Sequence, residues 1–147
     1  MLKTIERKNV MTTNRFSETD MKAFEPTEKI GIVATVTPEG LPHISLLTSI
    51  MAATPRQLIV GEFCKGKSKE YMQRTGKIGF AVMTMDKKLW RGKAVWTHLK
   101  KEGPEYETYN QQPMFRYNTY FGINTVHYFD LIQTSPGNSL PLLSIVK

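Results

Sequence analysis

The sequence of 147 residues contains a single cysteine, Cys64. An internal disulfide and a zinc site built from several thiolates are therefore excluded. No apolar run is long enough to cross a bilayer, because serine and threonine interrupt the longest candidate, residues 44–53. The first residues also lack the apolar block of a secretion signal. We therefore expect a protein of the cytoplasm with no membrane partner.

The sequence also lacks the residue groupings of common hydrolytic and metal sites. His43, His98 and His127 do not have the spacing of metal ligands, so no metal site is predicted. No serine–histidine–acid set and no paired carboxylates emerge to suggest hydrolysis. No catalytic residue can be assigned on this basis.

Positive charge is what the sequence has in abundance, and it is concentrated in one region. The formal net charge is +7, and residues 65–101 contain eleven Lys or Arg against only Glu70 and Asp86. A single positive region attracts any phosphorylated ligand, of which a polynucleotide is only one kind. A basic small barrel that binds nucleic acid is therefore one alternative, although we do not favour a nucleic-acid partner.

Residues 59–72 (IVGEFCKGKSKEYM) are the most informative segment. They predict an apolar strand, a cationic turn that contains glycine, and the start of a short helix. Unpaired amides and the positive end of the dipole at a helix start favour an anion, and lysines add charge. The segment therefore predicts a phosphate site.

The same segment matches the nucleotide-loop pattern G-x-x-x-x-G-K-[ST], with Gly61, Gly66, Lys67 and Ser68 in the required places. A nucleotide-binding protein of the ATPase or GTPase type is therefore a second alternative. That fold needs a parallel sheet with repeated crossover helices. Only one good helix is predicted after the motif, which weakens this hypothesis.

The pattern of apolar residues and turns predicts a mainly β fold with a few short helices. Strands are expected over residues 30–36, 41–51, 57–63, 77–85, 90–99 and 126–133, and helices over about 17–24, 67–74 and 104–112. Connections of mostly hairpin length indicate an antiparallel barrel. We expect one domain, residues 1–147, with residues 1–15 as a loose arm. Apolar residues on both faces of residues 30–36 and 41–51 suggest that a partner subunit covers one face.

Residues 32–43 (IVATVTPEGLPH) resemble the first hairpin of the FMN-binding split barrels related to pyridoxamine 5′-phosphate oxidase. Residues 58–61 with the lysine turn, residues 78–82 and residues 91–94 then follow in an order similar to that family's. The resemblance covers roughly residues 15–135. It implies a six-stranded antiparallel split barrel and a homodimer with FMN at the subunit interface. It also implies an oxidoreductase (a reductase, an oxidase or an electron-transfer protein) whose small-molecule or protein redox partner is unidentified.

The resemblance also implies which residues contact FMN. Lys65, Lys67 and Ser68 match the turn that holds the phosphate, and Trp90 would supply an aromatic wall from the opposite subunit. The segment that lies along the flavin, and the end of the third strand beside it, correspond to Leu46, Leu47, Thr48, Ser49, Glu62 and Phe63. The arginine-rich C-terminal segment of true pyridoxamine phosphate oxidases is not found here, so oxidation of vitamin B6 is not expected.

Overall fold

The computed structural model describes residues 12–25, 29–63, 67–112 and 125–139. Its helices are α1 (Glu18–Ala23), α2 (Lys67–Thr75) and α3 (Pro104–Gln111). Its strands are β1 (Lys29–Val36), β2 (Pro42–Leu46), β3 (Met51–Thr54), β4 (Gln57–Glu62), β5 (Lys77–Thr84), β6 (Lys88–Lys100), β7 (Thr125–Thr134) and β8 (Asn138–Ser139). None of the helices in the described ranges is long and apolar enough to cross a membrane.

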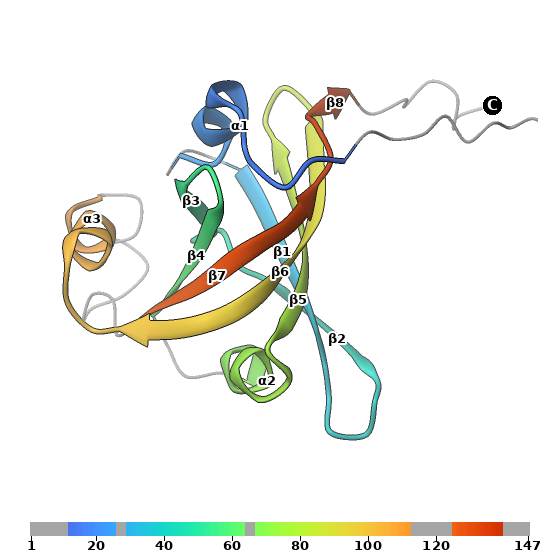
Figure 1. Cartoon of the computed structure of the whole chain (residues 1–147), viewed down its shortest axis with the longest axis vertical. Coiled ribbons are helices and arrows are strands. Elements are labelled where there is room, and N and C mark those ends of the chain that lie inside the picture. Colours follow the sequence, from blue (N-terminus) through green and yellow to red (C-terminus); the bar gives the residue numbers. More distant parts are fainter. Residues whose placement is uncertain (1–11, 26–28, 64–66, 113–124, 140–147) are drawn as a thin grey trace, which may run out of the picture.

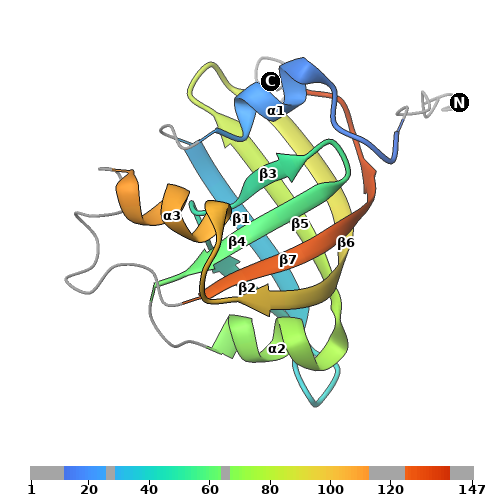
Figure 2. The same cartoon turned by 60° about the vertical axis from the view of Figure 1, so that its left-hand side comes forward.

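One antiparallel sheet dominates the molecule. Its described strands follow the order β2-β1-β5-β6-β7-β4-β3, and β8 pairs with β6. The strands curve around a common interior, with α1 at one end of the barrel and α2 at the other (Figure 1). Helix α3 lies outside, beside β3 and β4 (Figure 2). All the described strand pairs are antiparallel, so they do not form the parallel sheet that the nucleotide-loop hypothesis requires.

The prediction of a mainly β antiparallel fold is confirmed, but the predicted count of six strands is wrong. Residues 41–51, predicted as one strand, form β2 and β3 with a turn between them, and the short β8 is additional. In this turn the Ile50 amide donates to the Leu47 carbonyl at 3.2 Å. The Leu47 amide donates to the Gly31 carbonyl at 2.7 Å. A Cβ at Gly31 would overlap the Leu47 carbonyl, so glycine is what allows this close approach.

Local signals in the sequence set the other boundaries. Ser17 caps α1 with a capping box, in which its hydroxyl accepts from the Asp20 amide and the Asp20 carboxylate accepts from the Ser17 amide. Gly40 has a φ of 84° and closes the turn between β1 and β2, with its amide donating to the Thr37 carbonyl. Gly76 has a φ of 71° and ends α2. These turns and caps account for the agreement between the observed and predicted ends of α1, β1 and α2.

The core fills the barrel interior with side chains from most strands. Its buried members include Val33, Leu58, Val60, Phe80, Val82, Trp90 and Phe129. Phe16 and Phe24 cover the α1 end, with their ring centroids 4.8 Å apart and Phe24 edge-on to Phe80 at 6.1 Å. The last residues of the predicted arm lie against the barrel, where Thr13 forms two backbone hydrogen bonds with Thr134. Residues 1–11 lie outside the described residues.

Lys29, the first residue of β1, is a buried cation. It is 5% exposed, and its ammonium donates to the Glu25 carbonyl at 3.0 Å. Burial lowers the pKa of Lys29 to about 8. The unfolded chain therefore holds this proton more tightly than the folded protein does. Stability rises with pH between about 8 and the ordinary lysine pKa of about 10.4, because the unfolded state binds more protons in that window.

We predict that Lys29→Met removes this pH dependence. Between pH 8 and 10, the wild-type free energy of unfolding should increase by about 2 kcal/mol relative to the variant, as urea denaturation would measure. Lys77→Met, which removes an exposed lysine at the start of β5, should keep the wild-type slope. Parallel pH profiles for the wild type and Lys29→Met would contradict this assignment.

Candidate functional site

The turn of residues 47–50 lies between two strands of the barrel that do not pair with each other, β1 and β4. On one side, the Leu47 amide bonds to Gly31 of β1. On the other side, the Ser49 hydroxyl donates to the Gly61 carbonyl at 2.9 Å and accepts from the Gly61 amide at 3.2 Å. The buried side chain of Ser49 thus replaces the backbone pairing that a further strand would give β4. The turn joins the two sides of the sheet and fixes residues 47–49 between them.

Helix α3 holds this turn from outside the barrel. The Tyr109 hydroxyl donates to the Ser49 carbonyl, and the Phe63 ring meets the Tyr109 ring edge-on with centroids 6.1 Å apart. Tyr109 is fully buried, and burial raises the pKa of its hydroxyl well above the usual value. Tyr109 therefore remains a neutral donor that locks Ser49 and Phe63 in place.

The first turn of α2 contains polar groups that are buried without partners. Ser68 is 4% exposed and Lys69 is 8% exposed. Within the described residues, neither the Ser68 hydroxyl nor the Lys69 ammonium has a hydrogen-bonding partner. Burying such groups unpaired is costly, and the amides of a first helical turn also lack intrahelical acceptors. These donors fit an anion such as a phosphate.

The structure places the other predicted phosphate residues differently. The Lys67 side chain is 71% exposed, and its ammonium lies 3.4 Å from the Glu70 carboxylate. An ammonium in that position contributes long-range attraction. Lys65 lies outside the described residues. Lys69, which was not among the predicted site residues, is buried, unlike Lys67.

The remaining candidates fall into two groups. Leu47, Ser49, Glu62 and Phe63 are at least half-buried around the turn and the end of β4, whereas Leu46 and Thr48 are exposed beside them. Trp90 is not brought together with these residues. It is buried near α1, where its indole N–H donates to the Asp20 carboxylate at 2.8 Å and its ring meets Phe24 edge-on. These contacts make Trp90 a core residue of the opposite end of the barrel.

The structure also shows a buried pair that the sequence analysis missed. Nε2 of His127 lies 2.7 Å from Oε1 of Glu62, and His127 is fully buried in β7. From the sequence, the three histidines were judged only by their spacing, which does not suit metal ligands. His127 sits in the apolar run of residues 126–129, and its spacing from Glu62 along the chain gives no signal of their contact.

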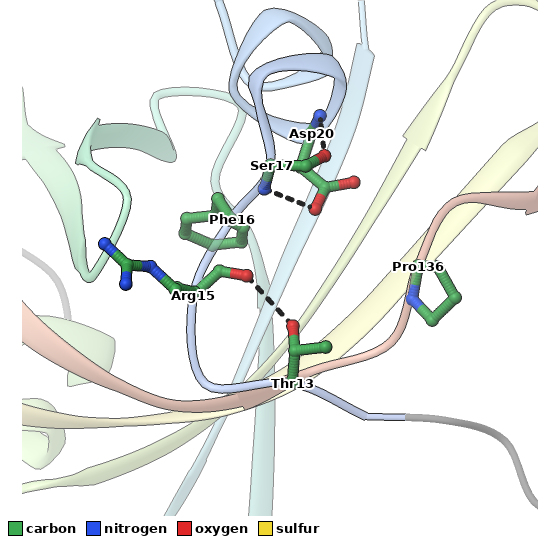
Figure 3. A pocket seen from close by; sticks show the side chains of 6 residues that line it. All are labelled: Thr13, Arg15, Phe16, Ser17, Asp20 and Pro136. Carbon is green, nitrogen blue, oxygen red and sulfur yellow. Dashed lines mark hydrogen bonds between the residues drawn. The ribbon is translucent and has the colours of Figure 1, made fainter.

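A cavity of about 540 Å³ lies beside α1 (Figure 3). Its lining residues are Thr13, Arg15, Phe16, Ser17, Asp20 and Pro136. Both carboxylate oxygens of Asp20 are engaged, one by the Ser17 amide and the other by the Trp90 indole. The Arg15 guanidinium extends away from Pro136 (Figure 3). The buried polar group of this cavity therefore stabilises the fold, in contrast to the unpaired groups of α2.

Comparisons with known proteins identify the fold. No protein-family model and no curated protein matches the sequence. Among solved structures, HupZ of Group A Streptococcus aligns with a TM-score of 0.64 at 17% identity, over 85% of this chain and 98% of HupZ. An FMN-binding protein from Syntrophomonas wolfei aligns with a TM-score of 0.60 at 16% identity, over 75% of this chain and 77% of the other.

A third structure, of a candidate pyridoxamine 5′-phosphate oxidase from Lactobacillus delbrueckii, has a TM-score of 0.59 at 17% identity. That alignment covers 84% of this chain and 96% of the other. The fold is the split barrel of the pyridoxamine 5′-phosphate oxidase type. The resemblance noted from the sequence is thereby confirmed for the fold of the split barrel. Similarity at these sequence identities establishes the fold only. The nature of the ligand has to be inferred from the residues of the site.

We predict that the Ser49 hydroxyl stabilises the split barrel through its two bonds to Gly61. Ser49→Ala removes both of these buried hydrogen bonds and should lower the free energy of unfolding by about 1–3 kcal/mol. Thr48→Ala changes an exposed hydroxyl in the same turn and should stay within about 0.5 kcal/mol of the wild type. Urea denaturation of both variants measures the difference, and equal stabilities would refute the role of Ser49.

Proposed function

We propose that this split barrel is a flavoprotein that binds FMN and acts as an oxidoreductase. The observation that carries the proposal is a pair of buried donors in the first turn of α2, Ser68 and Lys69, which have no partner among the described residues. A phosphate would accept hydrogen bonds from the Ser68 hydroxyl, the Lys69 ammonium and the free amides of the helix start. Lys67, and Lys65 as the resemblance implies, would add positive charge.

The flavin and its chain would lie against the residues between this anion site and the turn of residues 47–50. Leu46 and Leu47 offer apolar surface, and Thr48 offers a hydroxyl, whereas the buried Ser49 would position these neighbours. The hydrogen bonds from Ser49 to Gly61 and from Leu47 to Gly31 hold residues 46–49 in one position before a ligand binds. Glu62 and Phe63 continue this surface from the end of β4. Bound FMN would supply electron transfer, and these residues would bind and orient it.

We further propose that the protein is a homodimer with FMN at the subunit interface. Strand β2 is an edge of the sheet in the described part of the chain, and it exposes a row of large apolar side chains. Ile44 and Leu46 of β2 are 68% and 70% exposed, and Leu41, just before the strand, is 61% exposed. An apolar edge strand left in water promotes uncontrolled pairing, so a second subunit is the cover that the fold favours.

For cofactor binding, we predict that the protein quenches FMN fluorescence on titration. Ser68→Ala and Lys69→Met should each raise the dissociation constant about tenfold, because each removes one hydrogen bond to a charged group. Arg74→Met, an exposed change in the last turn of α2, should bind within about twofold of the wild type. Absence of binding by the wild type, or unchanged binding by Ser68→Ala, would reject the phosphate site.

For the dimer, we predict that a charge on β2 separates the subunits. Ile44→Lys should convert the dimer to a monomer in size-exclusion chromatography with light scattering, because the ammonium would be buried in an apolar interface. Ile132→Lys provides a matched control, since Ile132 is an exposed isoleucine on β7. A wild-type protein that elutes as a monomer would disprove the homodimer directly.

A further inference from the structure

His127 lies between an indole and a carboxylate inside the barrel wall. Nε1 of Trp96, on β6, is 3.2 Å from Nδ1 of His127. On the other side of the ring, Nε2 of His127 is 2.7 Å from Oε1 of Glu62. The imidazole is fully buried, and the Glu62 side chain is 14% exposed. Three residues from three neighbouring strands therefore form one chain of hydrogen bonds.

The chemistry of the indole fixes the direction of these bonds. An indole nitrogen can only donate, so Nδ1 of His127 must accept and carries no hydrogen. The single ring hydrogen is then on Nε2, which donates to the Glu62 carboxylate. An imidazolium would place a second N–H against the indole N–H, two donors with no acceptor between them. Trp96 thereby selects the neutral Nε2–H form of His127.

Glu62 is held by only one of its two oxygens. No hydrogen bond to Oε2 is found among the described residues, although the carboxylate is largely buried. A carboxylate with a purely structural role would be expected to have both oxygens satisfied, as those of Asp20 are. Glu62 also follows Gly61 directly, so it sits beside the Ser49 hydrogen bonds and just before the α2 segment.

We propose that His127 and Trp96 are positioning residues that hold Glu62 as an oriented acceptor for a ligand that presents an O–H or N–H donor. The inference rests on the proposed function, because FMN carries both kinds of donor, on its ribityl chain and on its ring. His127 acts only through Glu62, and Trp96 acts only through His127. The site therefore discriminates by donor chemistry as well as by phosphate charge.

The first test needs no ligand. Nitrogen-15 NMR of the protein without FMN at pH 7 should show His127 with a protonated Nε2 and an unprotonated Nδ1. In Trp96→Phe, the constraint on Nδ1 is removed and the nitrogen signals of this ring should shift. A protonated Nδ1 in the wild type, whether in the other neutral form or in an imidazolium, would overturn the proposal.

The second test measures FMN binding. His127→Phe removes the donor to Glu62 and should raise the FMN dissociation constant about tenfold, whereas His127→Gln retains an N–H donor and should recover most of the affinity. Unfolding curves of both variants separate this effect from lost stability. Wild-type affinity in a folded His127→Phe would overturn the proposal. If the wild type binds no FMN, the proposed function fails, and the ring nitrogen signals alone decide whether Trp96 and Glu62 fix His127.

Discussion

The paired hydrogen bonds between the Ser49 side chain and the backbone of Gly61 are the constraint on which the candidate site depends. The sheet has β2 and β3 at its two ends, and β1 and β4 do not pair with each other. Another contact must therefore hold β1 and β4 together. The turn of residues 47–50 does this, with the Leu47 amide on Gly31 and the Ser49 hydroxyl on Gly61. The same hydrogen bonds therefore close the barrel and fix the position of residues 46–49, the segment proposed to lie along the flavin.

The two ends of the barrel differ in how well their buried polar groups are satisfied. At the α1 end, Asp20 completes a capping box and also accepts from Trp90, so both of its carboxylate oxygens have a hydrogen-bond donor. At the α2 end, Ser68 and Lys69 are buried with no partner among the described residues, and Glu62 uses one oxygen. Since native structures rarely leave such groups unsatisfied, this asymmetry supports the proposed ligand site at the second end.

Local chemistry made much of the fold predictable. Gly40 and Gly76 end elements where a positive φ is needed, and Ser17 with Asp20 starts a helix, so these boundaries could be expected before the structure. The break between β2 and β3 could not. Residues 46, 47 and 50 are all apolar, and the bonds that end the strand come from Gly31 and Gly61, which are distant in the sequence.

The candidate site was only partly predictable for a related reason. The lysines of residues 65–69 predicted a phosphate site, but the sequence does not show which of these lysines is buried. The structure buries Lys69 and leaves Lys67 in solvent. Trp90 is paired with Asp20, and His127 with Glu62, across 70 and 65 positions of the chain. Side-chain contacts of that separation follow from strand register, which periodicity alone does not determine.

The most direct measurement of the central claim compares FMN with riboflavin, which has the same ring and chain but no phosphate. If the unpaired donors of α2 exist to bind an anion, calorimetric titration should show FMN binding at least about a hundredfold more tightly than riboflavin, as two charge-assisted hydrogen bonds would provide. Equal affinities for the two flavins would contradict the account, since the α2 donors would then contribute nothing to binding.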